Sequence, residues 1–139
     1  MESNLYAVID TNVLVSALIS KNPATPPLVV LAHVYSGDIT PVFNDEIIQE
    51  YRDVLSRKKF HLDPTDIDNA LQVFLDYGLN LNRTKVDDET MSDPKDIVFY
   101  EVKMTKEDAF LVTGNTKHFP RKPLVVTPRE MVEILEKVV

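Results

Sequence analysis

The sequence predicts an α/β fold in which helices cover both faces of a parallel β-sheet. Short apolar runs of strand length alternate along the chain with longer segments of helical period, as in repeated βαβ units. The runs are apolar almost throughout, as in residues 5–9, and such runs are typical of parallel strands buried on both faces. A chain of 139 residues is long enough to bury one compact core.

The N-terminal part of the chain alternates strands and helices in this way. Residues 5–9 form the first predicted strand, and residues 13–19 form a short helix after it. Residues 21–27 contain three prolines and are expected to form a loop. Residues 28–35 are a strongly apolar helix that a Ser-Gly pair ends, and residues 39–43 are the next strand.

A strongly amphipathic helix is expected next, with Asn44 as its capping residue. Its apolar residues share one face: Ile47, Ile48, Tyr51, Val54 and Leu55. We expect this helix to end in the basic triplet Arg57-Lys58-Lys59, because cations are favoured at helix C-termini.

Three later helices begin with a proline that directly follows a capping side chain. These pairs are Asp63-Pro64, Asp93-Pro94 and Thr127-Pro128. Glu130 stands in the capping-box position of the last helix. Short strands are expected at residues 79–81, 109–112 and 124–126, which gives about five strands in total.

Composition excludes several classes of protein. With 15 Lys and Arg against 22 Asp and Glu, the net charge of −7 excludes a basic, histone-like nucleic-acid binder, although a local basic patch can still guide a polyanion. The absence of cysteine excludes disulfide scaffolds, thiolate zinc sites and cysteine nucleophiles. None of the three histidines has a second histidine at ligand spacing, which disfavours zinc. Without a long apolar run or a signal-type start, we expect a cytoplasmic protein.

Acidic and polar residues gather where predicted strands end. Asp10 follows the first strand, and Thr113-Gly114-Asn115 follows the fourth. Helices that start or pass near the same sheet edge supply Glu50, Asp93 and Asp96. Such oxygen-rich sets bind hard cations such as Mg²⁺. Glycine-rich phosphate loops are missing, so a bound nucleotide cofactor is not expected.

Each of these acids also has an ordinary structural interpretation. Asp10 could simply cap the following helix. Glu50 could belong to a solvated helix face, although it lies about 40° from Val54 on the helical wheel and so close to the apolar face. Asp93 and Asp96 stand in the first turn of their helix, where the helix dipole favours acids regardless of function.

Two basic clusters could guide a polyanionic substrate to these acids, or could be solvated surface charge. The residues that we assign to this approach are Arg52, Arg57, Lys58, Lys59, Lys117 and Arg121.

Taken in order, five segments of the chain resemble PIN-domain nucleases. The segments are residues 5–14, Glu50-Tyr51, Asp93-Pro94-Lys95-Asp96, residues 111–115 and Lys117-His118-Phe119-Pro120. Each motif is short, but the ordered set covers nearly the whole chain. More narrowly, the sequence resembles the VapC-like toxins of bacterial toxin–antitoxin pairs.

The resemblance implies a three-layer α/β/α sandwich with a five-stranded parallel sheet, formed by residues 1–139 as a single domain. It also implies an Mg²⁺- or Mn²⁺-dependent ribonuclease that cleaves single-stranded or looped RNA and leaves a 5′-phosphate. Its catalytic residues would be Asp10, Glu50 and Asp96, which with Asn115 would also be the metal ligands. The supporting pocket residues would be Thr11, Asn12, Asp93 and Thr113. A small antitoxin protein would be the partner, without membrane association, and a homodimer stays open.

Asn115 is the one departure from the family pattern, because many members have a fourth acid there. The substitution removes one negative charge from the site, which weakens the binding of a second metal ion more than the binding of the first. A first alternative is therefore a catalytically weakened module that acts by binding RNA or protein. A second is a dehalogenase-like phosphatase, which would need an acid two residues after Asp10, where this chain has Asn12.

Overall fold

The computed structural model describes residues 5–81, 94–119 and 124–138, and within these ranges it contains five strands and six α-helices. The strands are β1 (Leu5–Ile9), β2 (Ile39–Phe43), β3 (Leu79–Asn80), β4 (Phe110–Val112) and β5 (Val125–Val126). The helices are α1 (Thr11–Ile19), α2 (Pro26–Ser36), α3 (Asp45–Leu55), α4 (Pro64–Tyr77), α5 (Pro94–Thr105) and α6 (Pro128–Val138). Two short 3₁₀ turns, η1 (Lys58–Phe60) and η2 (Thr116–His118), complete the order.

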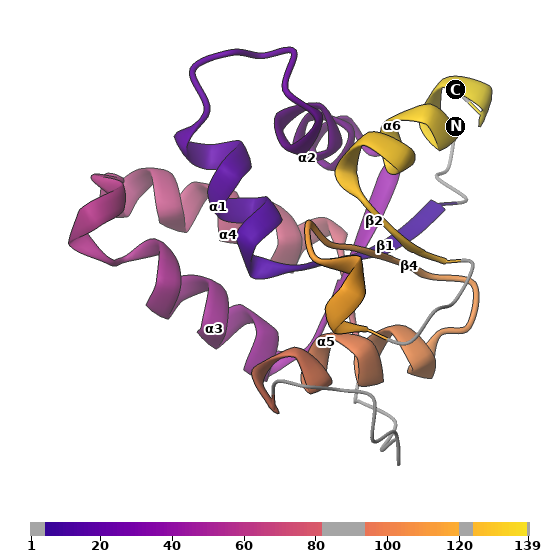
Figure 1. The fold of residues 1–139 in the computed structure, drawn as a ribbon. Helices are drawn as coiled ribbons and strands as arrows, with labels where there is room; N and C mark the ends of the chain where they lie inside the picture. Colours follow the sequence, from indigo (N-terminus) through magenta and orange to yellow (C-terminus); the bar gives the residue numbers. More distant parts are fainter. Residues whose placement is uncertain (1–4, 82–93, 120–123, 139) are drawn as a thin grey trace.

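The strands form one parallel sheet in the order β3-β2-β1-β4-β5, which confirms the predicted fold class. Helix α5 packs on β1, β2 and β4 on one side, whereas α2 and α6 contact each other on the other side, as Figure 1 shows. The molecule therefore has three layers, and β1 lies at the centre of the sheet. Its carboxyl end meets those of β2 and β4 at one edge.

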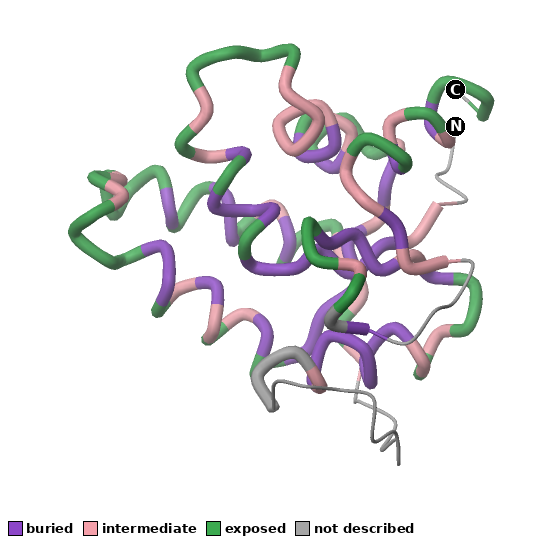
Figure 2. The backbone as a smooth tube through the Cα atoms, viewed as in Figure 1, coloured by how far each residue is buried: buried purple, intermediate pink, exposed green. Residues whose placement is uncertain are grey.

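The core fills the space between the sheet and both helix layers. Figure 2 shows buried backbone along the central strands and at the start of α1. Tyr51 of α3 is fully buried and meets Phe74 of α4 edge-on, with 5.6 Å between the ring centroids. The aromatic contact fixes α3 against α4 and places the residues beside Tyr51 at the sheet edge.

Most helix starts agree with the sequence-based predictions. The Asn44 side chain accepts a hydrogen bond from Ile47 N–H at 2.9 Å, and the Asp63 side chain caps α4. Thr127 and Glu130 form the predicted capping box. Helix α1 begins two residues earlier than predicted and α2 begins at Pro26, since proline suits the first turn of a helix.

One predicted helix end is wrong. Helix α3 stops at Leu55, with Ser56 as its C-terminal cap, so the triplet Arg57-Lys58-Lys59 does not form its last turn. Lys58 and Lys59 belong instead to η1, which follows α3. Within the described residues, no helix is both long enough and apolar enough to cross a membrane.

Candidate functional site

Asp10 lies at the carboxyl end of the central strand, where β1 passes into α1. Its backbone N–H donates to Val112 O at 2.9 Å and so ties the end of β1 to β4. Asp10 occupies the N-cap position of α1, but its side chain makes no capping hydrogen bond. Instead, its Oδ2 accepts a hydrogen bond of 2.7 Å from the Thr113 hydroxyl, and only 5% of the residue is exposed. The capping interpretation therefore does not account for this carboxylate.

Glu50 reaches the same region from the middle of α3. The residue is half-buried, and its Oε2 accepts a hydrogen bond from the hydroxyl of Thr11, the residue directly after Asp10. Glu50 is therefore not a member of a solvated helix face. Each acid thus has one carboxylate oxygen bound by a threonine hydroxyl: Thr113 binds Asp10, and Thr11 binds Glu50.

Tyr51 lies close enough to both acids for their charges to act on its phenol. Its hydroxyl donates to Ile9 O at 2.5 Å, directly before Asp10 in β1. Burial raises the pKa of Tyr51 well above its usual value, and the negative charges of Asp10 and of Glu50 raise this pKa further. The sequence placed Tyr51 on the apolar face of its helix and, together with Glu50, in one of the segments that resemble PIN domains. Neither pattern predicted its hydrogen bond to Ile9.

The end of β4 supplies the polar residues on the other side of Asp10. Thr113 is fully buried, and its Oγ1 also accepts a hydrogen bond of 3.1 Å from the backbone N–H of Asn115. Asn115 itself is exposed, at the N-cap position of η2. Asn12 is exposed in the first turn of α1.

Two predicted site residues cannot be placed in this way. Asp93 lies outside the described residues, and Asp96 lies in the first turn of α5, where the side chains are not described. In the part of the chain that the structure describes, no three His, Cys, Asp or Glu side chains gather closely enough to hold a metal ion. The described part of the site therefore contains two acids, Asp10 and Glu50.

The chemistry of these donors fits a hard divalent cation. Two carboxylates and the hydroxyls of Thr11 and Thr113 meet at one sheet edge, and all the donor atoms are oxygens. Mg²⁺ and Mn²⁺ prefer such ligands and are usually held by one or two carboxylates plus water and substrate phosphates.

The described members of the predicted basic set lie in α3, directly after it, in η1 and in η2. Arg52 forms an ion pair with Asp68 of α4, with 2.6 Å between Nη1 and Oδ1. The other described members of the set are exposed: Arg57, Lys58, Lys59 and Lys117. Lys59 Nζ lies 5.1 Å from the ring centroid of Phe60. Arg121 lies outside the described residues.

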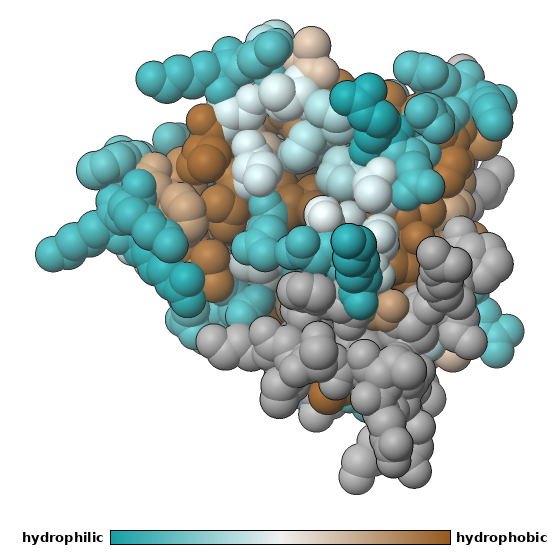
Figure 3. Space-filling view, viewed as in Figure 1, coloured by the Kyte–Doolittle hydropathy of each residue, from teal (hydrophilic) through white to brown (hydrophobic). Residues whose placement is uncertain are grey.

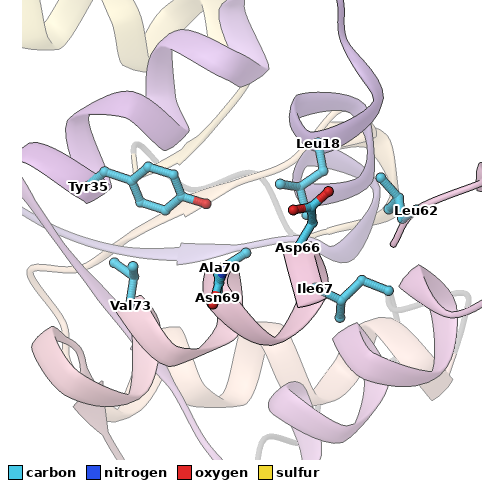
Figure 4. A pocket seen from close by; sticks show the side chains of 8 residues that line it. All are labelled: Leu18, Tyr35, Leu62, Asp66, Ile67, Asn69, Ala70 and Val73. Carbon is cyan, nitrogen blue, oxygen red and sulfur yellow. The ribbon is translucent and has the colours of Figure 1, made fainter. Parts of the chain in front are cut away.

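A hollow of about 360 Å³ lies elsewhere, between α1, α2 and α4. Figure 4 shows Tyr35 entering it from α2 and the Asp66 carboxylate entering from α4. Its remaining lining is apolar except for Asn69: Leu18, Leu62, Ile67, Ala70 and Val73. With a single carboxylate, this hollow lacks the donor set found at the edge of the sheet.

A comparison with protein families decides the classification. The sequence matches the PIN domain over residues 6–117, which is most of the chain. The chain belongs to the PIN-domain family. PIN domains are generally metal-dependent nucleases that act on RNA, and the matched span contains Asp10, Glu50 and Thr113. Comparisons with curated proteins and with solved structures gave no match.

Proposed function

We propose that this PIN domain is an Mg²⁺- or Mn²⁺-dependent endoribonuclease whose site is centred on Asp10. The supporting observation is the paired arrangement of Asp10 and Glu50 at the carboxyl edge of the sheet, each oriented by a threonine hydroxyl. Ligands in open parallel α/β folds bind outside this edge. We treat residues 1–139 as one domain and place the protein in the cytoplasm.

In this proposal, Asp10, Glu50, Asp96 and Asn115 would hold the metal ion. A bound Mg²⁺ or Mn²⁺ would polarise the phosphodiester and lower the pKa of a water molecule. Buried carboxylates of like charge repel one another, so such a site gains stability when a cation is present.

The protein's own groups then orient the reactants. Thr113 fixes Asp10 through Oδ2, and Thr11 fixes Glu50 through Oε2. Among the described contacts, Oε1 of Glu50 stays available, so this oxygen can accept a proton from the attacking water. Water adds to phosphorus, the P–O3′ bond breaks and the departing O3′ takes a proton from solvent, which leaves a 5′-phosphate on one product and a 3′-hydroxyl on the other.

Single-stranded or looped RNA is the proposed substrate, because its backbone can be drawn to a recessed site. Exposed Arg57, Lys58, Lys59 and Lys117 would attract it, and Asp93, Asn12 and Arg121 complete the proposed surroundings. Arg52 is already paired with Asp68 and would contribute less.

Cleavage of mixed RNA by the pure protein tests this function. We expect cleavage with Mg²⁺ or Mn²⁺, none with a chelator, and a loss of at least about 100-fold in Asp10→Asn. Asp108→Asn is the matched control, since Asp108 precedes β4 at the opposite edge of the sheet and pairs with Lys106. Cleavage that survives the chelator, or equal activity in the two variants, would contradict the proposal.

A second candidate is RNA binding without cleavage, which the exposed Asn115 in place of a fourth acid favours. In that case the wild-type protein retains RNA on a filter but releases no 5′-phosphorylated product at any divalent-ion concentration.

We also propose that the protein is the toxin of a toxin–antitoxin pair. The support is the resemblance of its motifs, and the partner would be a small antitoxin whose disordered tail folds across the acidic edge.

A further inference from the structure

A second feature of the same sheet edge is an open hollow of about 460 Å³ between α2, α6 and the end of β4. Its lining residues are Pro26, Pro27, Gly114, Thr127, Pro128 and Arg129. In Figure 3 the surface between α2 and α6 is pale, the colour of residues of intermediate hydropathy.

The hollow adjoins the acids through the backbone. Gly114 directly follows Thr113, whose hydroxyl binds Asp10, and Thr127 directly follows Val126, whose carbonyl accepts the Thr113 N–H at 2.9 Å. One residue step therefore separates the hollow from a side chain that touches Asp10. An RNA chain whose scissile phosphodiester lies at Asp10 would place a neighbouring nucleotide in this hollow.

The walls offer flat apolar surface and few backbone donors. Three of the six lining residues are prolines, which have no N–H and a fixed φ. Two N–H groups at the start of α6 are bonded within the helix, because Thr127 N–H donates to Glu130 Oε1 at 2.9 Å and Glu130 N–H donates to Thr127 Oγ1 at 3.1 Å. Few backbone N–H groups are therefore available here to bind a phosphate, whereas the flat face of a nucleobase can pack against the proline rings.

Side-chain hydrogen bonds hold the loop that precedes α2. Before the two prolines, the Ser20 and Thr25 hydroxyls lie 3.0 Å apart, and Ala24 N–H donates to the Asn22 side chain at 2.9 Å. These contacts hold the loop that leads into Pro26 and Pro27, so the proline wall of the hollow is formed before a ligand binds.

Arg129 supplies the cation of the hollow. The residue is exposed, and it forms no ion pair or side-chain hydrogen bond with any described residue. A planar guanidinium stacks on nucleobases and attracts the phosphates beside them, which lysine does less well. In a chain with a net charge of −7, an arginine that has no ion-pair partner among the described residues suits a polyanionic substrate.

From these features we infer that the hollow of Pro26, Pro27, Pro128 and Arg129 binds the nucleobase next to the scissile phosphate, with the base between the prolines and the guanidinium. The inference rests on the proposed ribonuclease function and adds a specificity subsite to it.

Short labelled single-stranded RNAs in which one nucleotide at a time lacks its base provide the test. For the wild type we expect one position, adjacent to the cleaved bond, at which loss of the base lowers kcat/KM about tenfold, the size of one lost stacking contact. Arg129→Ala should lower kcat/KM on the intact RNA by about the same factor, and its kcat/KM should not change further when the base is missing. Arg129→Lys should retain the salt dependence of binding but not the dependence on the base.

Two further variants sharpen this test. A Cβ on Gly114 would meet no atom within 4 Å, so Gly114→Leu should fold normally, fill the hollow and raise KM only for RNA that carries the base. Lys137→Ala is the matched control, because it removes one charge from the same helix about 12 Å further along.

The outcomes separate this inference from the proposed function. The subsite is wrong and the proposed nuclease function is retained if Asp10-dependent cleavage is intact but no position responds to loss of its base. The same holds if Arg129→Ala and Lys137→Ala have equal kcat/KM. If nothing is cleaved, fluorescence anisotropy with the same RNAs decides: Arg129→Ala must weaken binding of intact RNA only, and equal binding by both variants overturns the subsite.

Discussion

At the scale of single residues, two threonine hydroxyls define the geometry of the acids. Thr113 holds Asp10 and Thr11 holds Glu50, so one oxygen of each carboxylate is fixed before any ligand binds. Hydrogen bonds to carboxylates are stronger than those between neutral groups. Preorganisation of this kind lowers the cost of reorienting the acids when substrate arrives.

Tyr51 links these acids to the stability of the fold. Tyr51→Phe removes the hydrogen bond to Ile9 O, and we expect a loss of about 1–2 kcal/mol in the free energy of unfolding near neutral pH. Because the folded-state pKa of Tyr51 is raised, the unfolded state releases this proton first, and stability falls as the pH rises above about 10. In urea unfolding, Tyr51→Phe should therefore lack the part of the loss of stability above about pH 10 that comes from ionisation of Tyr51.

Tyr77→Phe is the control for this prediction, because Tyr77 is 72% exposed and lies at the end of α4. We expect it to change stability by less than about 0.5 kcal/mol and to leave the alkaline slope unchanged. The same alkaline slope in Tyr51→Phe and in the wild type would contradict the buried position of the phenol.

Asn115 tests the extent of the site. As a fourth ligand position, Asn115→Asp should raise Mn²⁺ affinity and lower stability in the presence of a chelator, because it adds a like charge near Asp10. Calorimetric titration and melting curves measure the two effects. If affinity is unchanged and stability shifts by less than about 0.5 kcal/mol, Asn115 is only an exposed residue of the turn.

At the scale of elements, local signals were sufficient to predict most boundaries. Proline after a capping residue predicted the starts of α4 and α6, and Asn44 predicted that of α3. The end of α3 was predicted too late, because the favourable effect of cations on a helix terminus does not show where the helix stops.

Contacts between distant residues could not be predicted in the same way. Thr11 and Glu50 are 39 residues apart, and Thr113 and Asp10 are 103 apart. The pairing of β1 with β4 brings Asp10 and Thr113 together, and the packing of α1 against α3 brings Thr11 and Glu50 together. Asp10 and Thr113 were indicated by their places after predicted strands. Thr11 entered only through family resemblance, and Tyr51 was assigned to the apolar face of its helix.

Gly78, at the junction of α4 and β3, is required by packing. A Cβ there would lie 2.4 Å from Phe74 O and 2.6 Å from Pro41 O, both backbone atoms that cannot move cheaply. We expect Gly78→Ala to destabilise the fold by about 1–3 kcal/mol in chemical unfolding.

Gly114→Ala is the control, because its Cβ would meet no atom within 4 Å. It should change stability by less than about 0.5 kcal/mol. Equal effects of the two substitutions would mean that α4 does not approach β2 as closely as described.

At the scale of the whole molecule, the proposed toxin role predicts a cellular effect. Expression of the wild type alone should slow growth of a bacterial host, whereas Asp10→Asn should not, because the effect depends on RNA cleavage. Growth curves of the two strains, with matched protein amounts, measure this difference. Harmless wild-type expression would remove the toxin role while leaving the nuclease proposal intact.

We propose that Asp10 and Glu50 belong to one divalent-cation site at the carboxyl edge of the sheet. Calorimetric titration of Mn²⁺ into the wild type, Asp10→Asn, Glu50→Gln and the control Asp108→Asn tests it most directly. We expect one site in the wild type and in the control, with affinity reduced at least about tenfold in each of the other two variants. Wild-type protein that binds no Mn²⁺, or that binds it no better than Asp10→Asn, would rule out a cation site at these two acids.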